Sequence, residues 1–337
     1  MQGRSFRFQA PAKLMLAGEY SVLGPSGLSL SLAIANQGVE AVGQSADVWQ
    51  IARDDLDLSW QVGQEVPFEL SFAHSAWQLA RQSSSAPGGP LRICTRNYGA
   101  AIAPTGKPGL GSSASAVVAV TAATLGEQAL AASSGKERVL DLALKAHQQA
   151  QGKRGSGYDV ATATLGGLVV WRKNTDGNYS GETITWPTNL HCLAGYCGTS
   201  ADTRHYLKSF SDWQASDNAD VDAELAMLSR PVEEMLQAVT STDYDQLHHA
   251  TRRAHDALLE WDRRFEMGIV TVPIAKMIEI SQKLKVAAKV SGAGGGDSLI
   301  AFSDDRDRLE ALAMQWREAG FWPYSVEVDP DGLKQIA

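Results

Sequence analysis

The sequence predicts an α+β fold, and three observations lead to this prediction. The chain has 337 residues, the length of roughly two domains or of one large α/β body, and 44% of them are hydrophobic, so a substantial core can form. Runs with the two-residue period of strands predominate toward the N-terminus. The C-terminal half alternates helical patterns with strand patterns, at a spacing typical of α+β proteins.

The N-terminal region is expected to form strands. Phe6–Gln9 is short, alternating and aromatic, and Pro11–Ile34 has the apolar residues of buried strands. Lys13 and Glu19 interrupt that run. Because an unpaired buried charge is costly, both need partners or a ligand, unless the run is a surface hairpin with two solvated charges. Gly38–Gln61 then alternates as a β-meander would.

A glycine-rich loop lies in the middle of the chain. Residues Pro104–Val118 read PTGKPGLGSSASAVV, with three glycines within six positions. Ser112 is the predicted N-cap of a helix over Ala114–Leu125. A glycine loop at a helix N-terminus presents free N–H groups and the positive end of the helix dipole, which suits a phosphate. An ordinary capped turn is the alternative, since the Walker pattern occurs nowhere in the chain.

Periodicity and glycine or proline breaks place the remaining elements. The predicted helices are Phe68–Gln82, Lys136–Gln151, the stretch from Asp220 to about Lys285, and Asp305–Gly320. A short helix is predicted to begin at Asp159, and Gly198–Phe210 is predicted to be a loop that leads into a helix. The predicted strands are Leu91–Thr95, Leu168–Trp171, Leu190–Cys197, Val286–Val290 and Trp322–Val328, with a loop at Ser83–Pro90. Apolar residues in the long helical stretch recur at spacings of three and four, which indicates core packing.

Two further glycine-rich loops carry polar side chains. The first, Gly152–Gly157, contains Lys153, Arg154 and Ser156. The second, Ser291–Phe302, has four glycines in five positions, followed by an aspartate. Four glycines are conformationally costly without a ligand or a close backbone approach, although a simple turn remains the alternative.

Composition narrows the class of partner. The 30 Lys and Arg residues against 38 Asp and Glu give a net charge of −8, which argues against nucleic acid or an anionic membrane as the main partner. Cys94, Cys192 and Cys197 form no C-x-x-C motif and are expected to be thiols of a reducing compartment. The first residues lack the apolar core of a signal peptide, and no run approaches membrane-spanning length. We therefore expect a cytoplasmic protein.

Three stretches together resemble one family. They are PAKLMLAGEYSVL (11–23), PTGKPGLGSSASA (104–116) and VSGAGGGDSLIAF (290–302). Their order and separation resemble those of the GHMP kinases, the superfamily of galactokinase, homoserine kinase, mevalonate kinase and phosphomevalonate kinase. The resemblance covers essentially the whole chain. It implies a ribosomal-protein-S5-like domain at 1–185, a ferredoxin-like domain at 186–337, and ATP in the cleft between them.

Within that superfamily the chain most resembles the phosphomevalonate kinases. Tyr20 stands where mevalonate kinases usually carry histidine, and Asp297 where they tend to have another glycine. The segment Ala146–Ala161 and the loop GTSADTRHYL (198–207) resemble the phosphomevalonate kinase versions. Mevalonate kinases place a magnesium-binding glutamate about eleven residues before the catalytic aspartate, and here that position is Gln148.

The resemblance implies an ATP-dependent phosphotransferase that uses Mg²⁺ and takes phosphomevalonate as acceptor. Mevalonate kinase, another small-molecule GHMP kinase and a catalytically silent ligand-binding homologue stay open as alternatives. The expected partners are small molecules, with no nucleic acid and no membrane, and the protein is expected to be a monomer or homodimer.

Phosphoryl transfer requires in-line positioning, a divalent ion, and cations on the transferring phosphate. Lys13 and Lys107 are the predicted catalytic cations. Asp159 is predicted to orient the attacking phosphate oxygen or accept its proton, with a helix N-cap as the alternative. A serine hydroxyl, Ser112 or Ser113, could ligate Mg²⁺, and Ser113 is the predicted metal ligand.

The other predicted site residues belong to the same motifs. The ATP-binding residues are Pro108, Gly109, Leu110, Gly111, Ser112, Ser113 and Ala114. The substrate-binding residues are Glu19, Tyr20, Lys153, Arg154, Ser156, Gly157, Ser200, His205, Lys208, Ser291, Gly292, Ala293 and Gly294. Arg204 is a further basic candidate, although Arg204, His205 and Lys208 would also fit a solvated helix face.

Overall fold

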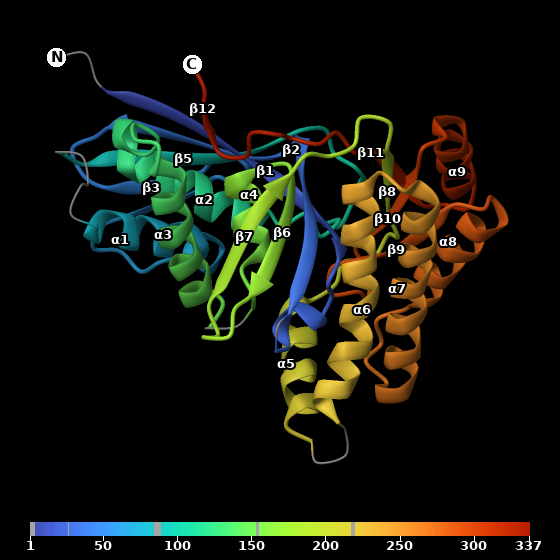
Figure 1. Cartoon of the computed structure of the whole chain (residues 1–337). Helices are drawn as coiled ribbons and strands as arrows, with labels where there is room; N and C mark the ends of the chain where they lie inside the picture. The colour runs from blue at the N-terminus through green and yellow to red at the C-terminus, as the bar shows by residue number, and fades with distance from the viewer. Residues whose placement is uncertain (1–3, 26, 84–88, 153–154, 217–219) are drawn as a thin grey trace.

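The computed structural model describes residues 4–25, 27–83, 89–152, 155–216 and 220–337, and it contains two β-sheets (Figure 1). The larger sheet has the order β12-β1-β2-β5-β3-β4, with β6 and β7 added beside β2. Its strands are β1 Ser5–Ala17, β2 Leu28–Ser45, β3 Gln50–Arg53, β4 Leu58–Gln61, β5 Leu91–Tyr98, β6 Leu168–Lys173, β7 Tyr179–Ile184 and β12 Lys334–Gln335. The smaller sheet has the order β11-β8-β10-β9, formed by β8 His191–Tyr196, β9 Ala287–Ser291, β10 Ser298–Ser303 and β11 Trp322–Ser325. The predicted α+β class is confirmed.

Helices cover both sheets. Those of the first half are α1 Ser71–Gln82, α2 Ser112–Leu125, α3 Gly135–Ala150 and α4 Tyr158–Leu165, and those of the second half are α5 Thr203–Gln214, α6 Val221–Ser241, α7 Tyr244–Phe265, α8 Val272–Lys283 and α9 Arg306–Glu318. Short 3₁₀ turns occur at Ser21–Leu23, Asp54–Leu56, Phe68–Leu70 and Gly126–Gln128. The helices predicted from periodicity are confirmed, and the stretch after Asp220 proves to be three helices. No helix among the described residues is long and apolar enough to cross a membrane.

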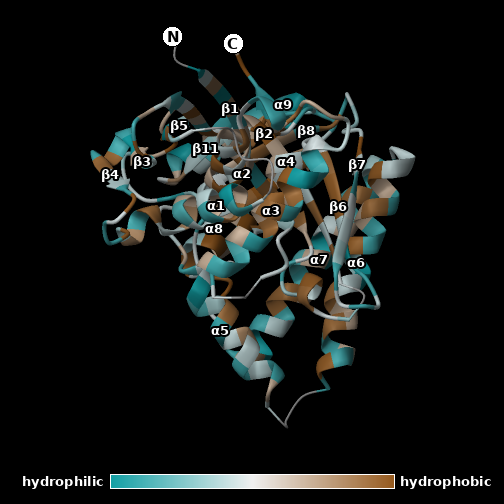
Figure 2. Cartoon of the chain, turned by 90° about the vertical axis from the view of Figure 1, so that its left-hand side faces the viewer, coloured by the Kyte–Doolittle hydropathy of each residue, from teal (hydrophilic) through white to brown (hydrophobic). Residues whose placement is uncertain are grey.

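The core of the first half lies between the larger sheet and helices α1 to α4. Most residues of α2 are buried, because Ala, Val and Thr occupy nearly all of its surface and it packs on strands and helices at once. Hydrophobic residues also run along β6 (Figure 2), whose Leu168 and Val170 belong to a core shared with β8, β10 and α6. A common core therefore joins the two halves of the chain.

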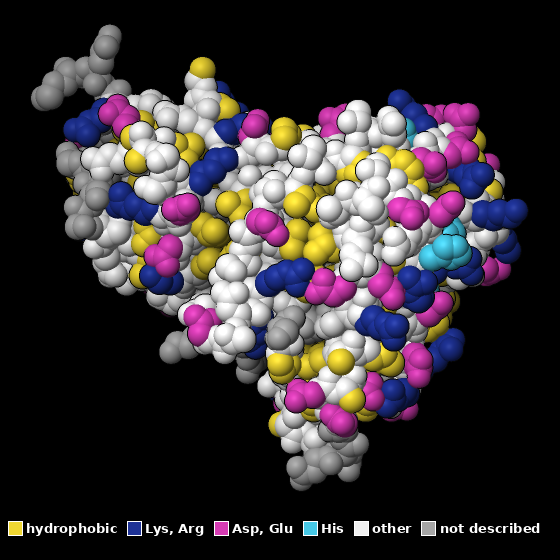
Figure 3. All heavy atoms as spheres, viewed as in Figure 1, with side chains coloured by type: hydrophobic (Ala, Val, Ile, Leu, Met, Phe, Trp, Pro, Cys, Tyr) yellow, Lys and Arg dark blue, Asp and Glu magenta, His cyan; other side chains and the backbone are white. Residues whose placement is uncertain are grey.

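The second half has a ferredoxin-like arrangement. Its four strands are antiparallel, and in chain order they lie fourth, first, third and second across the sheet. The predicted core stripe of the long helical stretch is confirmed, since Leu247, Ala250, Leu258 and Trp261 are buried. The outer faces of α6 and α7 carry charges of both signs (Figure 3), in pairs such as Arg253–Glu234 at 2.6 Å.

The end of the chain returns to the first sheet. Strand β12 pairs with β1, so that Phe8 faces Gln335 and Gln9 faces Lys334. The division of the chain into 1–185 and 186–337 stays a prediction, and the final residues contribute to the larger sheet whichever division is drawn.

The predicted meander over Gly38–Gln61 is wrong. Strand β3 pairs with β4, but its other neighbour is β5, which runs parallel to it and lies between it and β2. The reason is helix α1, which carries the chain across between β4 and β5 and lets β5 enter the gap. Strand β7 was not predicted at all, because its sequence YSGETI contains glycine and is mostly polar and exposed.

The predicted N-cap Ser112 is also wrong, and the N-cap that was the alternative role of Asp159 is excluded. Helix α2 begins at Ser112 itself, and its N-cap is Gly111, at φ 75° and without a side-chain cap. Helix α4 likewise has Gly157 as N-cap, at φ 76°, so Asp159 lies inside its first turn. Glycine adopts this left-handed entry without strain. Helix α2 therefore begins with no side chain bonded to its first N–H groups, whereas in α4 the amide of Val160 donates to Oδ1 of Asp159.

Three polar contacts join strand β1 and the turn after it to strand β9 and the loop after it. The amide of Met15 donates to Oγ of Ser291 at 3.0 Å, and the hydroxyl of Tyr20 donates to the carbonyl of Ala293 at 2.5 Å. Nζ of Lys289 bonds Oε1 of Glu19 at 2.5 Å, with both side chains buried. Burial lowers the pKa of Lys289, and the adjacent carboxylate opposes that shift. The prediction that a buried Glu19 needs a partner is therefore confirmed, and that partner is Lys289.

The Lys289–Glu19 pair yields a stability prediction. Replacing Lys289 by Met leaves a buried carboxylate without its cation, so we expect the free energy of unfolding to fall by about 3–5 kcal/mol, measured by urea denaturation. The matched control is Lys283→Met, which breaks an exposed pair with Glu279 on α8 and should cost less than about 1 kcal/mol. Adding Glu19→Gln to Lys289→Met should recover part of the loss. Equal stability of the two lysine variants would contradict the prediction.

Candidate active site

A cavity of about 760 Å³ lies where the glycine-rich loops of both halves meet, and its size is typical of small-molecule sites. It is bordered by β1, the glycine loop before α2, the start of α4, the loop before α5, and the loop after β9. The predicted residues that line it are Lys13, Glu19, Tyr20, Lys107, Pro108, Gly109, Leu110, Gly111, Ser112, Ser113, Ser156, Gly157, Asp159, Ser291, Gly292 and Ala293. Arg204 and Asp297 line it as well.

Five predicted site residues do not line the cavity. They are Ala114, Ser200, His205, Lys208 and Gly294. Ala114 is a buried core residue of α2, and Gly294 packs against Ile269 so closely that a Cβ would collide. Lys153 and Arg154 lie outside the described residues.

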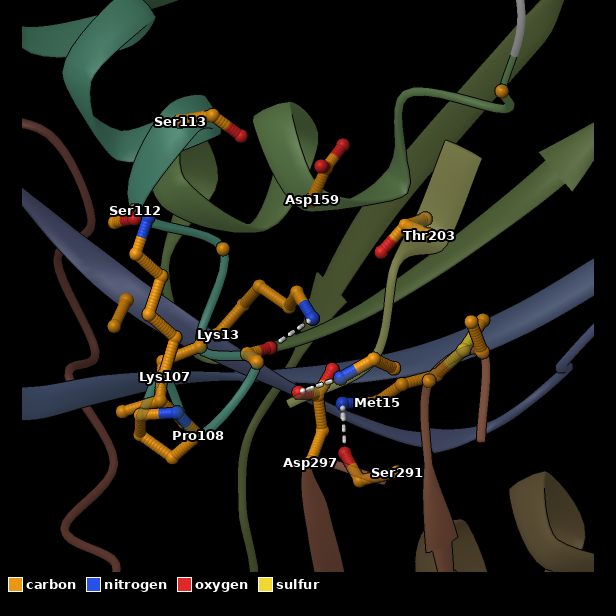
Figure 4. A pocket seen from close by; sticks show the side chains of 18 of the residues that line it. Lys13, Met15, Lys107, Pro108, Ser112, Ser113, Asp159, Thr203, Ser291 and Asp297 are labelled. Carbon is orange, nitrogen blue, oxygen red and sulfur yellow. Dashed lines mark hydrogen bonds between the residues drawn. The ribbon is translucent and has the colours of Figure 1, made fainter. Parts of the chain in front are cut away.

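The glycine loop is fitted around two side chains (Figure 4). Nζ of Lys13 donates to the carbonyl of Gly109 at 2.9 Å, and the backbone amide of Lys13 donates to Leu110 at 2.9 Å. A Cβ on Gly109, at φ 73°, would collide with Oδ2 of Asp297. A Cβ on Gly111 would lie 2.9 Å from Cε of Lys13. Only glycine satisfies both the left-handed backbone and these close approaches, which explains the glycine spacing.

Lys13 supplies a buried cation to the cavity. Its Nζ lies 5.4 Å from the centre of the Tyr158 ring. Burial lowers the pKa of Lys13, but Tyr158, Asp159 and Asp297 oppose the burial effect and raise the pKa above its ordinary value. The side chain therefore carries a positive charge at neutral pH, although it is only 6% exposed.

Asp159 lies at the start of α4 and faces a histidine that sequence reasoning missed. Its Oδ1 accepts from the amide of Val160 at 2.9 Å, and its Oδ2 lies 3.8 Å from Nε2 of His147. The same Nε2 lies 3.4 Å from Oγ of Ser113. The sequence comparison drew attention to Gln148 instead, but Gln148 is exposed on α3 whereas His147 is buried and lines the cavity. The buried positions of α3, at spacings of three and four, were the signal that could have identified it.

Asp297 lies beneath the glycine loop. Its Oδ1 accepts from the amide of Ala201 at 3.0 Å, which ties the loop before α5 to the loop after β9. Burial raises the pKa of this carboxyl, while the bond from Ala201 and the charge of Lys13 oppose the shift. The backbone of Asp297 is left-handed, with φ 57°.

Ser200 holds the backbone of Lys107 instead of facing the cavity. The amide of Lys107 donates to Oγ of Ser200 at 2.6 Å, and that hydroxyl donates back to the carbonyl of Lys107 at 2.9 Å. Ser200 thus holds the glycine loop in place, and its predicted substrate contact stays a prediction. The side chain of Lys107 remains exposed at the cavity.

The sequence left open whether the basic residues of α5 bind substrate or belong to a solvated helix face, and the structure places them differently. Lys208 pairs with Asp212 at 2.8 Å on an exposed face, and His205 packs beside Tyr206. Both belong to a solvated helix face. Arg204 lines the cavity and lies 5.2 Å from the centre of the Phe68 ring, so it joins the two sides of the cavity.

The donor set of the cavity fits Mg²⁺ held together with phosphates. No group of three or more His, Cys, Asp or Glu side chains among the described residues could hold a metal ion by itself. The hydroxyl of Ser113 and the carboxylate of Asp159 lie 3.4 Å and 3.8 Å from Nε2 of His147, so both oxygens border the same part of the cavity. Mg²⁺ usually binds through one or two carboxylates, water and substrate phosphates, which matches these two residues.

Two family models match the chain, and they do so in the order that the motifs predicted. Residues 103–167 match the GHMP kinases N terminal domain, and residues 235–321 match the model described as GHMP kinases C terminal. The phosphomevalonate kinase of Streptomyces sp. (strain CL190) is 26% identical, over 96% of this chain and 97% of that protein. The mevalonate kinase of Pyrococcus furiosus is 23% identical, over 96% of each.

Solved structures share the fold over nearly the whole chain. A Lin0012 protein from Listeria innocua has a TM-score of 0.86 at 21% identity, covering 99% of both chains. The Streptococcus pneumoniae phosphomevalonate kinase in complex with phosphomevalonate and AMPPNP has a TM-score of 0.78 at 23% identity, covering 97% of this chain and 100% of that one. The predicted architecture of two sheet-containing halves is therefore confirmed at the level of the fold.

Proposed function

Because the chain carries both the N-terminal and the C-terminal domain of a GHMP kinase, we propose that it transfers the γ-phosphate of ATP to the phosphate group of (R)-5-phosphomevalonate. The products are 5-diphosphomevalonate and ADP, and the reaction belongs to the mevalonate pathway of isoprenoid synthesis. The observation that carries the reaction class is the convergence of a buried cation, a glycine loop at a helix N-terminus and Asp159 in one cavity.

The acceptor is supported by likeness to phosphomevalonate kinases. Those of Streptomyces and Saccharolobus solfataricus are each 26% identical to this chain over nearly its full length. Tyr20 and Asp297, which differ from the histidine and glycine expected of mevalonate kinases, contact the carbonyl of Ala293 and the amide of Ala201. Mevalonate kinase is the second candidate, because the mevalonate kinases of Pyrococcus furiosus and Thermococcus onnurineus match 96% of this chain at 23% and 24% identity.

In the proposed step, an oxygen of the acceptor phosphate attacks the γ-phosphorus of ATP. The new O–P bond forms as the bond to the β,γ-bridging oxygen breaks, and ADP leaves with that electron pair. The amides of the glycine loop and the N-terminus of α2 hold the phosphates. Lys13 and Lys107 offset the charge on the transferring group. Ser113 and Asp159 would help to hold Mg²⁺, which would neutralise phosphate charge.

Asp159 orients the nucleophile in this proposal. A phosphate monoester is already largely dianionic near neutral pH, so the acceptor requires less help from a base than an alcohol does. An alcohol acceptor would instead require Asp159 to take a proton. The same residue therefore suits either candidate reaction, and the acceptor must be identified by experiment.

Repulsion between the two anionic substrates must be offset locally. Among the described residues, Lys13, Lys107 and Arg204 are basic groups at the cavity that serve this purpose in our proposal. Lys153 and Arg154 stay predicted substrate contacts. The cavity is also lined by predicted substrate contacts that stay predictions, namely Ser156, Gly157, Ser291, Gly292 and Ala293. A cytoplasmic location and a monomeric or dimeric state likewise stay predictions.

The acceptor is tested by coupled measurement of ADP release with 5-phosphomevalonate and with mevalonate. We expect turnover with 5-phosphomevalonate. Turnover with mevalonate alone would replace the proposed acceptor by the second candidate. Absence of ATP turnover with every acceptor would instead support a silent ligand-binding homologue.

Two substitutions test the proposed catalytic groups. Lys107→Ala and Asp159→Ala should each lower kcat by about 100-fold or more, because each removes a charge from the reacting centre. The unfolding free energy should change far less. Lys208→Ala and Asp212→Ala, which break an exposed pair outside the cavity, are the matched controls and should leave kcat unchanged. Near-wild-type kcat in a purified variant would remove that residue from the mechanism.

Gly109→Ala tests the role of the glycine loop in nucleotide binding. The new methyl group would meet Asp297, so the loop must move, and we expect affinity for a non-hydrolysable ATP analogue to fall about tenfold or more in calorimetry. Gly177→Ala is the control, because Gly177 has φ 84° but nothing within 4 Å of an added Cβ. Equal affinities of the two variants would count against phosphate binding at this loop.

A further inference from the structure

His147 is a buried, chemically active side chain that neither the motifs nor the proposed step uses. It belongs to the last turn of α3, and its ring packs against Phe72 at a centroid distance of 5.0 Å. Its side chain is only 5% exposed, yet it borders the cavity. The Phe72 ring packs against one side of the imidazole, and the other side borders the cavity.

That nitrogen stands between two groups assigned to phosphoryl transfer. Oγ of Ser113, in the first turn of α2, is 3.4 Å away, and Oδ2 of Asp159, in the first turn of α4, is 3.8 Å away. The first distance is a long hydrogen bond and the second is too long for one. Hydrogen bonds of catalytic groups often tighten when substrate binds, so these distances are compatible with a shorter His147–Asp159 contact in the substrate complex.

The chemistry of the three groups fixes the direction of the bond. An ionised carboxylate only accepts hydrogen bonds, so Nε2 must carry the hydrogen if His147 is to hold Asp159. The other carboxylate oxygen, Oδ1, is already held by the amide of Val160. Oδ2 is thus the oxygen whose orientation remains to be set, and Nε2–H of His147 is the donor that faces it.

We propose that His147 is a positioning residue of the phosphoryl-transfer site, whose Nε2–H directs Oδ2 of Asp159. An imidazole is suited to this task because it holds a carboxylate without adding negative charge beside two phosphate-bearing substrates. The inference rests on the proposed phosphotransferase activity, but it does not depend on which acceptor is used.

The kinetic test compares three variants with the acceptor that turns over. His147→Leu removes the donor and should lower kcat about 10- to 100-fold with less than about a threefold change in KM for ATP. His147→Gln keeps an N–H donor near Nε2 and should stay within about fivefold of wild type. Gln148→Leu, at the exposed neighbouring position, is the control. Wild-type kcat in His147→Leu, or equal losses in the Leu and Gln variants, would overturn the proposal.

A double-mutant cycle tests whether His147 acts through Asp159. His147→Leu combined with Asp159→Ala should be no slower than Asp159→Ala alone, because the carboxylate to be positioned is already gone. Multiplicative losses would show that the two residues act independently, and this would refute the positioning role.

A spectroscopic readout is independent of turnover. In ¹⁵N–¹H correlation spectra of the full-length protein, we expect His147 to be the Nε2–H tautomer and its Nε2 signal to move on Asp159→Asn. The opposite tautomer would refute the inference. If no acceptor is turned over but this signature is present, the proposed function fails while the His147–Asp159 contact stands. This measurement also decides the question if His147→Leu fails to fold.

Discussion

The ion pair between Lys289 and Glu19 is the constraint on which the site depends. Neither charge can be buried alone without a large cost, so strand β9 and the turn after β1 must stay together for the chain to fold. The pair brings the amide of Gly292 within 3.4 Å of the same carboxylate, beside the bonds from Met15 to Ser291 and from Tyr20 to Ala293. Two segments more than 260 residues apart in sequence thereby become one wall of the cavity.

Local sequence signals predicted the elements of the site but not their partners. Glycine spacing predicted the loop before α2, and the charges of Lys13 and Glu19 inside an apolar run indicated that these side chains need partners. The partner of Glu19 could not be deduced, because Lys289 lies in an ordinary strand and only the tertiary fold brings it near. The same limit explains the meander, since nothing between Gly38 and Gln61 reveals that β5 will pair beside β3.

The sequence could not predict individual site residues where the role of a residue depends on the direction in which its side chain points. His147 and Gln148 differ by one position, yet the turn of α3 buries one and exposes the other. A loop serine such as Ser200 can face a ligand or a backbone, and here it bonds both polar groups of Lys107. Ser112 has the residue type of an N-cap, but the left-handed Gly111 takes that position and makes the serine the first helical residue.

Among the described residues, the cavity is lined by four carboxylates and by four Lys or Arg side chains, and the carboxylates already have protein partners. Each carboxylate that lines it among the described residues, namely Glu19, Asp159, Asp202 and Asp297, accepts a hydrogen bond from a protein N–H, donated respectively by Lys289, Val160, Arg204 and Ala201. These carboxylates therefore already accept hydrogen bonds from the protein. The amides at the start of α2, in contrast, have no side-chain cap, and Lys13 carries a positive charge because its pKa is raised. A chain with a net charge of −8 can in this way present a locally cationic surface to phosphates.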